Sequence, residues 1–591
     1  MYLAVEKNRH DLIIPDSNKR LGVVFVVVLL ATVICVVKLF ILMVIQHDFY
    51  SALAANSQEV FSKLSPDRGS VYIQDSRTGE EYPLAINRDF FMVFADTREI
   101  KDDKTAEDTA EKIAQVFEYN DEEKLELFYQ LNKRDDPYEP LKKKVEEETV
   151  DSLKAMELSG IGFIRQSERY YPESNLAAHV IGFLGRNESD QSVGRYGIEG
   201  YWNEELYGSG GFFSGAKSAA GGKITLAKNS FKPPEDGVNI LLTIDRTLQY
   251  MACERLKEAM EEYKAKSASL IIIDPYSGAI RAMCSMPDFD PNKYNEIEAG
   301  DVYNNTAIFT PYEPGSVFKP IIMAAAINEG VVRPETDFFD SGSADAGCGK
   351  SIKNAGDKSY GQQNMIGVLE NSINTGMVFV AGKLGKQKMK QYVEDFGFGI
   401  KEGIELDSEM TGNIDSFDKN EDKEFDCYTA TASFGQGISA TPLQLVSAFA
   451  VIANGGTLVK PYIVEELRYP NGKIEKTKVK EIREVLDKKT TSLVSGMLVN
   501  VVDNGQAKRA GVKGYYVAGK TGTAQIAGPG GYSQDYIHSF IGFAPVDNPK
   551  FVMIVKFEKP AEIKYADSTT APVFADIAKF ALQYYQIPPG R

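Results

Sequence analysis

Three short patterns in the chain combine residue types that can transfer an acyl group. They are Ser-x-x-Lys at Ser316 and Lys319, Ser-x-Asn at Ser372 and Asn374, and Lys-Thr-Gly-Thr beginning at Lys520. A serine hydroxyl becomes a strong nucleophile only when a base removes its proton. Lysine can be that base when burial and a second cation disfavour its charged form. Together, the patterns predict a serine nucleophile served by lysines.

The Ser-x-x-Lys pattern begins at three serines, and only the surroundings distinguish them. Ser214 lies in a glycine-rich stretch and Ser416 in an acidic loop, whereas Ser316 opens the apolar run SVFKPIIMAAAINEG. Residues three apart share a helix face, so Lys319 would stand beside the Ser316 hydroxyl. Pro320 is tolerated in a first turn, so we expect a helix that begins near Ser316. The alternative is a serine N-cap beside a surface lysine.

The Ser-x-Asn pattern is weaker when it is taken alone. The hydroxyl of Ser372 could relay a proton from the lysine to the leaving amine, and the amide of Asn374 could hold the substrate backbone. The competing interpretation is that both residues cap a helix that follows from Met377. The order of the three patterns along the chain favours the catalytic interpretation.

The stretch GYYVAGKTGTAQ also matches an unrelated pattern. From Gly514 to Thr521 it satisfies G-x-x-x-x-G-K-[ST], the phosphate-binding P-loop. Bulky Tyr515, Tyr516 and Val517 occupy positions where a phosphate site needs small residues. The residues after Thr521 are too rich in glycine to carry the helix that such a site requires. We therefore expect no nucleotide here.

As a strand, the same stretch can serve the serine. Alternation would turn Lys520 and Gly522 toward one side and Thr521 and Thr523 toward the other. Glycine at 522 would let a substrate approach the backbone closely. Lys520 would supply the second cation and bind an anionic carboxylate of the substrate. We expect all four residues to contribute to substrate binding.

Composition excludes several other classes of function. The chain has four histidines and five cysteines without a C-x-x-C pair, so we expect no metal site and no cofactor. No histidine sits in a nucleophile-elbow context, which disfavours a Ser-His-Asp site. A net charge of −17 argues against nucleic acid as a partner. Cys348 and Cys427 could pair in an oxidising compartment, but we favour buried or free thiols.

The N-terminus predicts a membrane anchor. Residues 21–45 are apolar apart from Lys38, and as a helix they would be about 37 Å long, enough to cross a bilayer. Basic residues are concentrated in 1–20, so the tail is expected in the cytoplasm and everything after 45 outside the cell membrane. The alternative is a cleaved signal peptide, for which Ala52 to Ala55 offer a site.

The remaining chain predicts an α+β fold. Its length allows roughly three or four domains. Residues 46–232 mix short strands with polar helices at 106–117 and 122–131, a charged loop and helix face at 133–150, and a turn or hinge at 208–222. Residues 233–591 begin with a strand at 238–245, a helix and a hairpin, and end with strands that flank a mostly helical middle.

The motifs in this order resemble the class B penicillin-binding proteins, which are monofunctional D,D-transpeptidases. The similarity covers nearly everything after residue 65 and includes DRGSVY, RYYPESNLAAHVIGFLG, GRYGIEGYWNEELYG, YEPGSVFKP, SFGQGISATPLQLVSAFAVIANGG, AGKTGTAQ and HSFIGFAP. It implies an elongated α+β pedestal at 46–232. It also implies a transpeptidase domain at 233–591, in which an antiparallel sheet is flanked by helices beside a helical subdomain.

The resemblance also implies a reaction. Ser316 would attack the D-Ala-D-Ala end of a peptidoglycan stem peptide, and an amine of a neighbouring strand would resolve the acyl-enzyme. The amide N–H groups of Ser316 and Thr523 would form the oxyanion hole. β-Lactams would acylate the same serine. Expected partners are the lipid bilayer, a membrane glycosyltransferase or polymerase and other division proteins, since SGIGFIRQSERYYP and FADTREI look like the septal branch.

Two sequence differences bear on this resemblance. The segment IQDSRTGEEY replaces a D-R-N-G turn, which affects only pedestal detail. Residue 373 is Ile where many serine β-lactamases have Asp, which is common in transpeptidases and disfavours a hydrolase. A β-lactamase or D,D-carboxypeptidase would differ only in using water as the acceptor. A division scaffold with a vestigial site is the non-enzymatic alternative. A bifunctional enzyme with glycosyltransferase activity lacks support, because 46–232 already matches a pedestal.

Overall fold

The computed structural model describes most of the chain after residue 58. The described residues are 59–64, 66–134, 136–189, 191–216, 230–297, 299–420, 422–528, 531–561 and 563–591, preceded only by Leu29, Thr32 and Lys38. The tail predicted at 1–20 and, apart from those three residues, the span predicted at 21–45 lie outside them. Among the helices that the structure describes, none is both long and apolar enough to cross a bilayer.

The chain divides into two compact units, 1–66 with 209–235 and 67–208 with 236–591. The described part of the first unit is an antiparallel sheet in the order β1-β8-β9 (Glu59–Leu64, Gly211–Ala216 and Ser230–Lys232). The expectation of a turn or hinge at 208–222 is therefore wrong for β8. Pairing with β1 on one side and β9 on the other satisfies the backbone of this glycine-containing segment.

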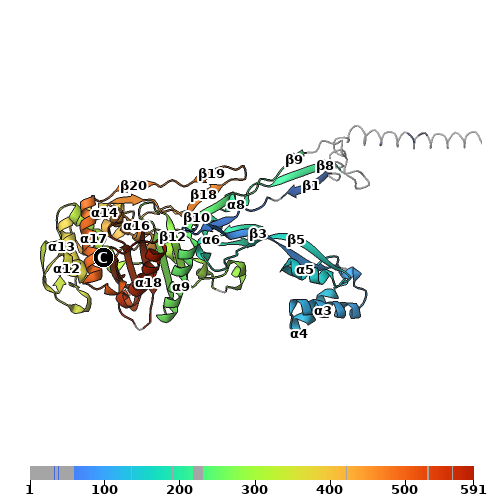
Figure 1. Ribbon diagram of the computed structural model, residues 1–591, viewed down its shortest axis with the longest axis horizontal. Coiled ribbons are helices and arrows are strands. Elements are labelled where there is room, and N and C mark those ends of the chain that lie inside the picture. Colours follow the sequence, from blue (N-terminus) through green and yellow to red (C-terminus); the bar gives the residue numbers. More distant parts are fainter. Residues whose placement is uncertain are drawn as a thin grey trace, which may run out of the picture. The chain divides into compact units, whose positions relative to one another are not determined.

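The second unit begins with a sheet backed by three helices (Figure 1). The elements are β2 (Val71–Gln74), β3 (Glu81–Ala95), α3 (Asp103–Phe117), α4 (Asp121–Leu131), β4 (Glu139–Val145), α5 (Glu147–Lys154) and β5 (Ile161–Tyr170). Both predicted helices are present and bury Ile113 and Leu127 in a common core. The charged tract at 133–150 was expected to be a loop and helix face, but its middle is β4. Pairing with β3 satisfies the backbone hydrogen bonds on one side of β4. The charged side chains of β4 are tolerated because it is an edge strand.

A buried ion cluster links the next elements to the start of this unit. These elements are α6 (Ala178–Ile181), β6 (Phe183–Arg186), β7 (Ser192–Arg195), α7 (Gly197–Tyr201) and α8 (Asn203–Tyr207). Glu199 is fully buried between Arg68 at 2.5 Å and Arg169 at 2.6 Å. Burial alone would raise the pKa of Glu199, but the two guanidinium groups outweigh it and hold that pKa below its usual value. Removing one arginine would strand a charge, so this cluster fixes distant segments together.

Strand β10 (Asn239–Asp245) continues the sheet that contains β2 and β3, called the first sheet below. It pairs in parallel with β2 and antiparallel with β18 (Val464–Arg468), which in turn pairs with β19 (Ile474–Lys476). The strand order is β19-β18-β10-β2-β3-β4, with β5 beside β3. The sequence places β10 after the boundary predicted at 232. The hydrogen bonds of its backbone nevertheless join it to the strand near residue 71.

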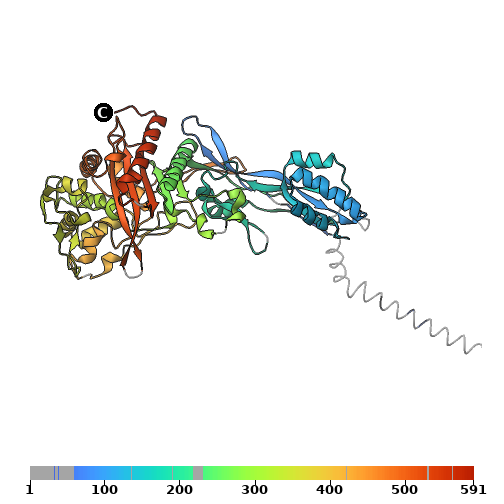
Figure 2. The same ribbon diagram turned by 90° about the horizontal axis from the view of Figure 1, so that it is seen from below.

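The second sheet, whose later strands are orange to red in Figure 2, has five antiparallel strands in the order β12-β11-β23-β22-β21. The strands are β11 (Ser267–Ile273), β12 (Ile280–Met286), β21 (Ala518–Gly528), β22 (Gly531–Ala544) and β23 (Phe551–Glu558). Helices α9 (Arg246–Glu262) and α18 (Thr570–Tyr584) pack together on this sheet, and α16 (Pro442–Ala453), buried along its whole length, also packs against it. The predicted strand, helix, hairpin and terminal strand pair are confirmed.

The remaining helices form the helical middle, and the remaining short strands lie in two-stranded pairs, apart from β19, which pairs with β18. The helices are α10 (Thr306–Phe309), α11 (Lys319–Asn328), α12 (Met365–Glu370), α13 (Asn374–Leu384), α14 (Lys386–Asp395), α15 (Cys427–Ala432) and α17 (Lys488–Asp503). Short strands are β13 (Asp337–Asp340), β14 (Ser343–Ala344), β15 (Ile352–Lys353), β16 (Gly361–Asn364), β17 (Thr457–Val459), β19 (Ile474–Lys476) and β20 (Glu481–Glu484).

The preference for free thiols is wrong. Cys253 of α9 is bonded to Cys284 of β12, and Cys348 is bonded to Cys427 at the start of α15. The first pair could not be inferred from spacing, because only the packing of α9 on β12 brings its members together. Cys35 lies outside the described residues.

Candidate active site

The predicted nucleophile lies on a 3₁₀ turn directly before a helix. Gly315–Phe318 forms the turn, and α11 begins at Lys319 with Pro320 in its first turn. The expected helix start is thus correct to within one turn, but the first turn is tighter than an α-helix. In a 3₁₀ turn, side chains at i and i+3 eclipse each other, which aligns Ser316 with Lys319.

The Lys319 side chain is the centre of the site. Its residue is fully buried. Its Nζ lies 2.7 Å from the Ser372 carbonyl oxygen, 3.1 Å from Ser372 Oγ and 2.7 Å from Asn374 Oδ1. The Ser-x-x-Lys and Ser-x-Asn patterns, far apart in sequence, therefore meet at one nitrogen. A neutral amine can donate two hydrogens to the two carbonyl oxygens and keep its lone pair for a hydroxyl proton.

The environment of Lys319 favours that neutral form. Burial, and second the nearby cation of Lys520, hold the pKa of Lys319 well below its usual value. Burial also lowers the pKa of Lys520, to about 7. Lys520 can therefore lose its proton near neutral pH, and its charged form disfavours charge on Lys319. This is the electrostatic arrangement that a lysine base requires.

Ser372 occupies an unusual backbone conformation between α12 and α13. Its φ is 55°, in the left-handed region that residues other than glycine seldom adopt. A residue held there costs about 1–3 kcal/mol, and the conformation persists only because the surrounding contacts offset that cost. The turn directs both the carbonyl and the hydroxyl of Ser372 at Lys319.

Asn374 connects the lysine to the rim of the site. Its Oδ1 accepts from Lys319, and its Nδ2 donates to the Lys353 carbonyl at 3.0 Å. The helix expected from Met377 begins earlier, at Asn374, and its N-cap residue Ile373 makes no side-chain cap bond. The capping interpretation of Ser372 and Asn374 is therefore wrong, because both side chains are used by Lys319 instead.

The stretch GYYVAGKTGTAQ forms a strand from Ala518 onward and no P-loop. Ala518–Gly528 is β21, which pairs with β22 with one register shift between Gln525 and Ala527 and leads into no helix. Thr521 and Thr523 line the cleft beside Ser316, whereas Lys520 is fully buried beneath them with Nζ 3.3 Å from the Thr521 carbonyl. The expected alternation is present. Lys520 itself does not line the cleft.

Gly522 has a different neighbour from the one expected. A Cβ there would lie 2.4 Å from Ser539 Oγ and 2.9 Å from Val317 Cγ1. The missing side chain thus lets β21 approach the turn that carries Ser316, and protein atoms rather than substrate fill the space.

The patterns converge on one cleft of about 530 Å³. Its lining includes Ser316, Ser372, Asn374, Thr521 and Thr523 of the predicted set. It also includes residues that no sequence pattern singles out, among them Asn354, Lys358, Tyr360, Gln506, Tyr536, Lys564 and Asp567. Most of these lie on connecting segments whose path the sequence does not specify. Within the described residues, no group of three or more His, Cys, Asp and Glu side chains is placed to hold a metal ion.

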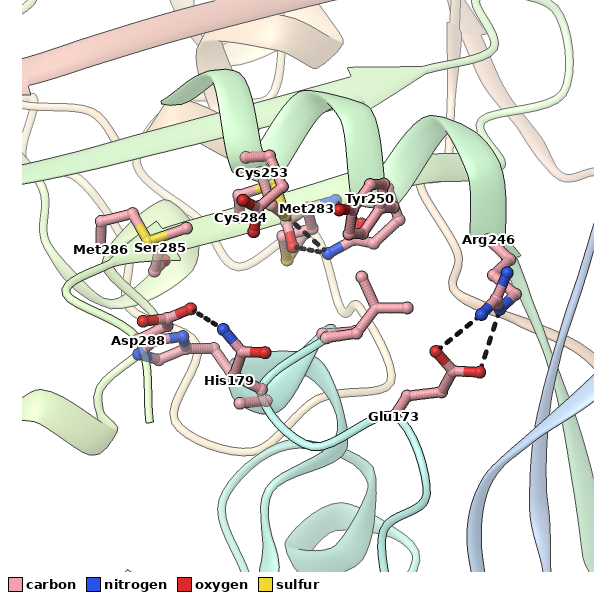
Figure 3. A pocket seen from close by; sticks show the side chains of 16 residues that line it. Glu173, His179, Arg246, Tyr250, Cys253, Met283, Cys284, Ser285, Met286 and Asp288 are labelled. Atoms are coloured by element: carbon pink, nitrogen blue, oxygen red, sulfur yellow. Dashed lines mark hydrogen bonds and ion pairs between the residues drawn. A yellow bond between two sulfur atoms is a disulfide. The ribbon is translucent and has the colours of Figure 1, made fainter. Parts of the chain in front are cut away.

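A second, smaller cavity of about 140 Å³ lies beside α9 and contains none of the predicted site residues (Figure 3). The disulfide between Cys253 and Cys284 forms part of its wall. At one end Arg246 pairs with Glu173 at 3.0 Å, and at the other Asn175 donates to Asp288. Arg246 and Glu173 are therefore paired with each other, and Asp288 accepts from a neutral amide.

Two family models match the chain. The penicillin-binding protein transpeptidase domain matches residues 268–579, and the penicillin-binding protein dimerisation domain matches residues 63–242. The second match ends inside β10, consistent with a strand that belongs to the first sheet.

Named relatives and solved structures agree. The chain is 33% identical to stage V sporulation protein D of Bacillus subtilis over 92% of this chain and 82% of that protein. It is 28% identical to the peptidoglycan D,D-transpeptidase FtsI homolog of Mesostigma viride, over 94% of each. Penicillin-binding protein 3 of Mycobacterium tuberculosis, solved with aztreonam, has the same fold, with a TM-score of 0.67, 24% identity and coverage of 90% of this chain and 98% of that chain.

Proposed function

Because the chain belongs to the penicillin-binding proteins that carry a dimerisation domain and a transpeptidase domain, we propose a role for each residue of its cleft in peptide cross-linking. The protein is a serine-type peptidoglycan D,D-transpeptidase. The observation that carries the assignment of roles is the Lys319 nitrogen, which joins Ser372 and Asn374 one 3₁₀ turn from Ser316.

In the acylation step, neutral Lys319 takes the hydroxyl proton of Ser316 while Ser316 Oγ attacks the carbonyl of the penultimate D-Ala. The developing oxyanion is stabilised by the amide N–H groups of Ser316 and Thr523. Ser372 passes the proton from Lys319 to the leaving nitrogen, so that D-Ala departs with a neutral amine. In the second step an amine of a neighbouring stem peptide attacks the ester, and the same groups return the proton.

Substrate contacts are divided between the two faces of β21. The hydroxyls of Thr521 and Thr523 lie in the cleft and bind the terminal carboxylate of the donor directly. Lys520 contributes its charge from beneath, and Asn374 holds the donor backbone. Gly522 acts through packing, because it keeps β21 against the Ser316 turn.

The site assignment is tested by labelling with fluorescent penicillin. The wild type is expected to form a stable covalent adduct that Ser316→Ala does not form. Ser214→Ala is a matched control, because Ser214 begins a second Ser-x-x-Lys pattern in the sequence, and it should label like the wild type. Label on Ser316→Ala, or none on the wild type, would refute the role of Ser316.

The rate of release separates transpeptidase from hydrolase. A transpeptidase excludes water from the acyl-enzyme, so bound penicillin should persist for many minutes. Rapid, repeated hydrolysis of penicillin would instead support a β-lactamase. The D,D-carboxypeptidase alternative predicts release of D-Ala without an acceptor amine.

We further propose that residues 21–45 anchor the protein in the cell membrane with 1–20 in the cytoplasm and the cleft outside. The apolar run and the basic tail support this orientation. We place the pedestal at 46–232 and the transpeptidase domain at 233–591, with β10 of the later domain paired to β2 of the pedestal in one sheet. Stem peptides and β-lactams would be the ligands of the cleft.

A role at the division septum, together with a membrane polymerase and other division proteins, is our proposal for the cellular context. It rests on the segments SGIGFIRQSERYYP and FADTREI and is compatible with a relative named as an FtsI homolog. Fluorescent fusion protein that spreads evenly around the cell through division would contradict it.

A further inference from the structure

One wall of the cleft is a short segment between β23 and α18. Lys564, Tyr565, Ala566 and Asp567 of this segment line the cleft, yet Ala566 is almost fully buried. A segment that is outside regular strands and borders a binding site needs other contacts to fix it.

The segment contacts a predicted substrate-binding residue directly. The amide N–H of Ala566 donates to Thr523 Oγ1 at 3.2 Å. A threonine hydroxyl has one hydrogen to donate and two lone pairs to accept with. Since the Ala566 amide occupies one lone pair, the hydrogen of Thr523 must point elsewhere, and the cleft is the open space that Thr523 borders.

The opposite side of Ala566 is fixed by two buried threonines. Its carbonyl accepts from Thr570 Oγ1 at 3.0 Å and from Thr569 Oγ1 at 3.4 Å. Thr569 Oγ1 in turn lies 3.0 Å from Nδ1 of His538. Thr569, Thr570 and His538 are all fully buried.

These contacts form a closed ring, because His538 of β22 is also the direct register partner of Thr523 of β21. Partners in an antiparallel pair point to the same face of the sheet. The backbone pair therefore sets the distance between Thr523 and His538, and the path through Thr569 and Ala566 bridges them a second time.

We propose that His538 is a positioning residue, which through Thr569 and the backbone of Ala566 orients the Thr523 hydroxyl as a hydrogen-bond donor to the carboxylate of the substrate. The proposal rests on the binding role that we assign to Thr523. No direct role in proton transfer is needed, since His538 does not line the cleft. Burial lowers the pKa of His538 to about 4, so its imidazole stays neutral and keeps the same hydrogen-bonding pattern at neutral pH.

The test compares two ligands that differ only in the carboxylate: a penicillin with the free acid and its methyl ester. The readout is the second-order rate of acylation of Ser316. Thr569→Val keeps the shape of the side chain but removes the hydroxyl that His538 contacts, and Thr569→Ser restores it. His538→Asn interrupts the same ring of contacts by removing the imidazole that lies beside Thr569. Thermal unfolding is measured for every variant.

The expected result is a loss of preference rather than a general loss of activity. Thr569→Val should slow acylation by the free acid about tenfold, the scale of one hydrogen bond to a charged group, and leave the ester within about twofold. Thr569→Ser should behave like the wild type. Equal slowing with both ligands, or an unchanged preference for the acid, would overturn the positioning role. Absence of acylation in the wild type would overturn the proposed function and this inference with it.

Discussion

At the scale of single residues, the site depends on one serine in a conformation that serine avoids. Ser372 has a φ of 55°, and both its carbonyl and its hydroxyl contact Lys319. An ordinary extended or helical serine could not present both groups to one nitrogen from this turn. The backbone strain is thus tied to the chemistry, a coupling found where active sites hold unfavourable conformations.

Ser372→Gly should separate stability from activity. Glycine adopts a positive φ freely, so the free energy of unfolding should be unchanged or rise by up to about 1 kcal/mol. The relay hydroxyl is lost, so acylation by penicillin should fall by about 10²- to 10⁴-fold. Denaturant unfolding and stopped-flow acylation measure the two effects. A variant that is both less stable and fully active would contradict this account.

At the scale of elements, the nucleophile depends on how closely β21 lies against the turn at Gly315–Phe318. Gly522 is the point of closest approach, because Ser539 Oγ and Val317 leave no room for a Cβ. Gly315 also has a positive φ and lies near Ala524 on the same strand. The two elements therefore act as one rigid unit that sets the distance from Ser316 to the threonines of β21.

Gly522→Ala should push β21 away from the turn. We expect a loss of about 1–3 kcal/mol in the free energy of unfolding, as is typical for overpacking, and a large loss of Ser316 acylation. Gly528→Ala is the matched control on the same strand, where the nearest atom to a new Cβ is 3.8 Å away. If both substitutions had the same small effect, the packing at Gly522 would not matter.

At the scale of the whole molecule, two disulfides close loops in the chain, although the sequence pattern favours unpaired cysteines. Cys253 and Cys284 are separated by 31 residues, and Cys348 and Cys427 by 79. Restricting the unfolded chain in this way is worth about 4 kcal/mol for each loop in the chain-entropy model. The second pair also connects the segment near β15 with α15.

Reduction should therefore lower the melting temperature by several degrees. Cys348→Ser combined with Cys427→Ser should show a smaller further loss on addition of dithiothreitol than the wild type does. Calorimetry with and without reductant makes the comparison. A wild type that is insensitive to reductant would mean that the bonds do not form in solution.

The sequence predicts the catalytic residues of this chain better than it predicts which of its segments pack together. Ser316, Lys319, Ser372 and Asn374 are found because their types and order are informative. Distances place Ser372 and Asn374 at the Lys319 nitrogen, and Ser316 lies in the turn that precedes Lys319. The reason for Gly522, the strand at 139–145 and both disulfides depend on which segments pack together, which local patterns do not determine. Lys564 and the other residues on connecting segments were missed for the same reason.

The pairing of β2 with β10 sets an order of events during synthesis. Ser70 donates to the side chain of Asn239, 169 residues later in the chain, and the parallel strands meet at the same place. Because the chain is synthesised from its N-terminus, β2 and β3 are made first, and the edge of β2 stays unpaired until β10 has been synthesised. The earlier half can then complete its sheet only with a strand from the later half, so premature termination before residue 239 would leave a fragment with an unpaired edge that is prone to aggregate.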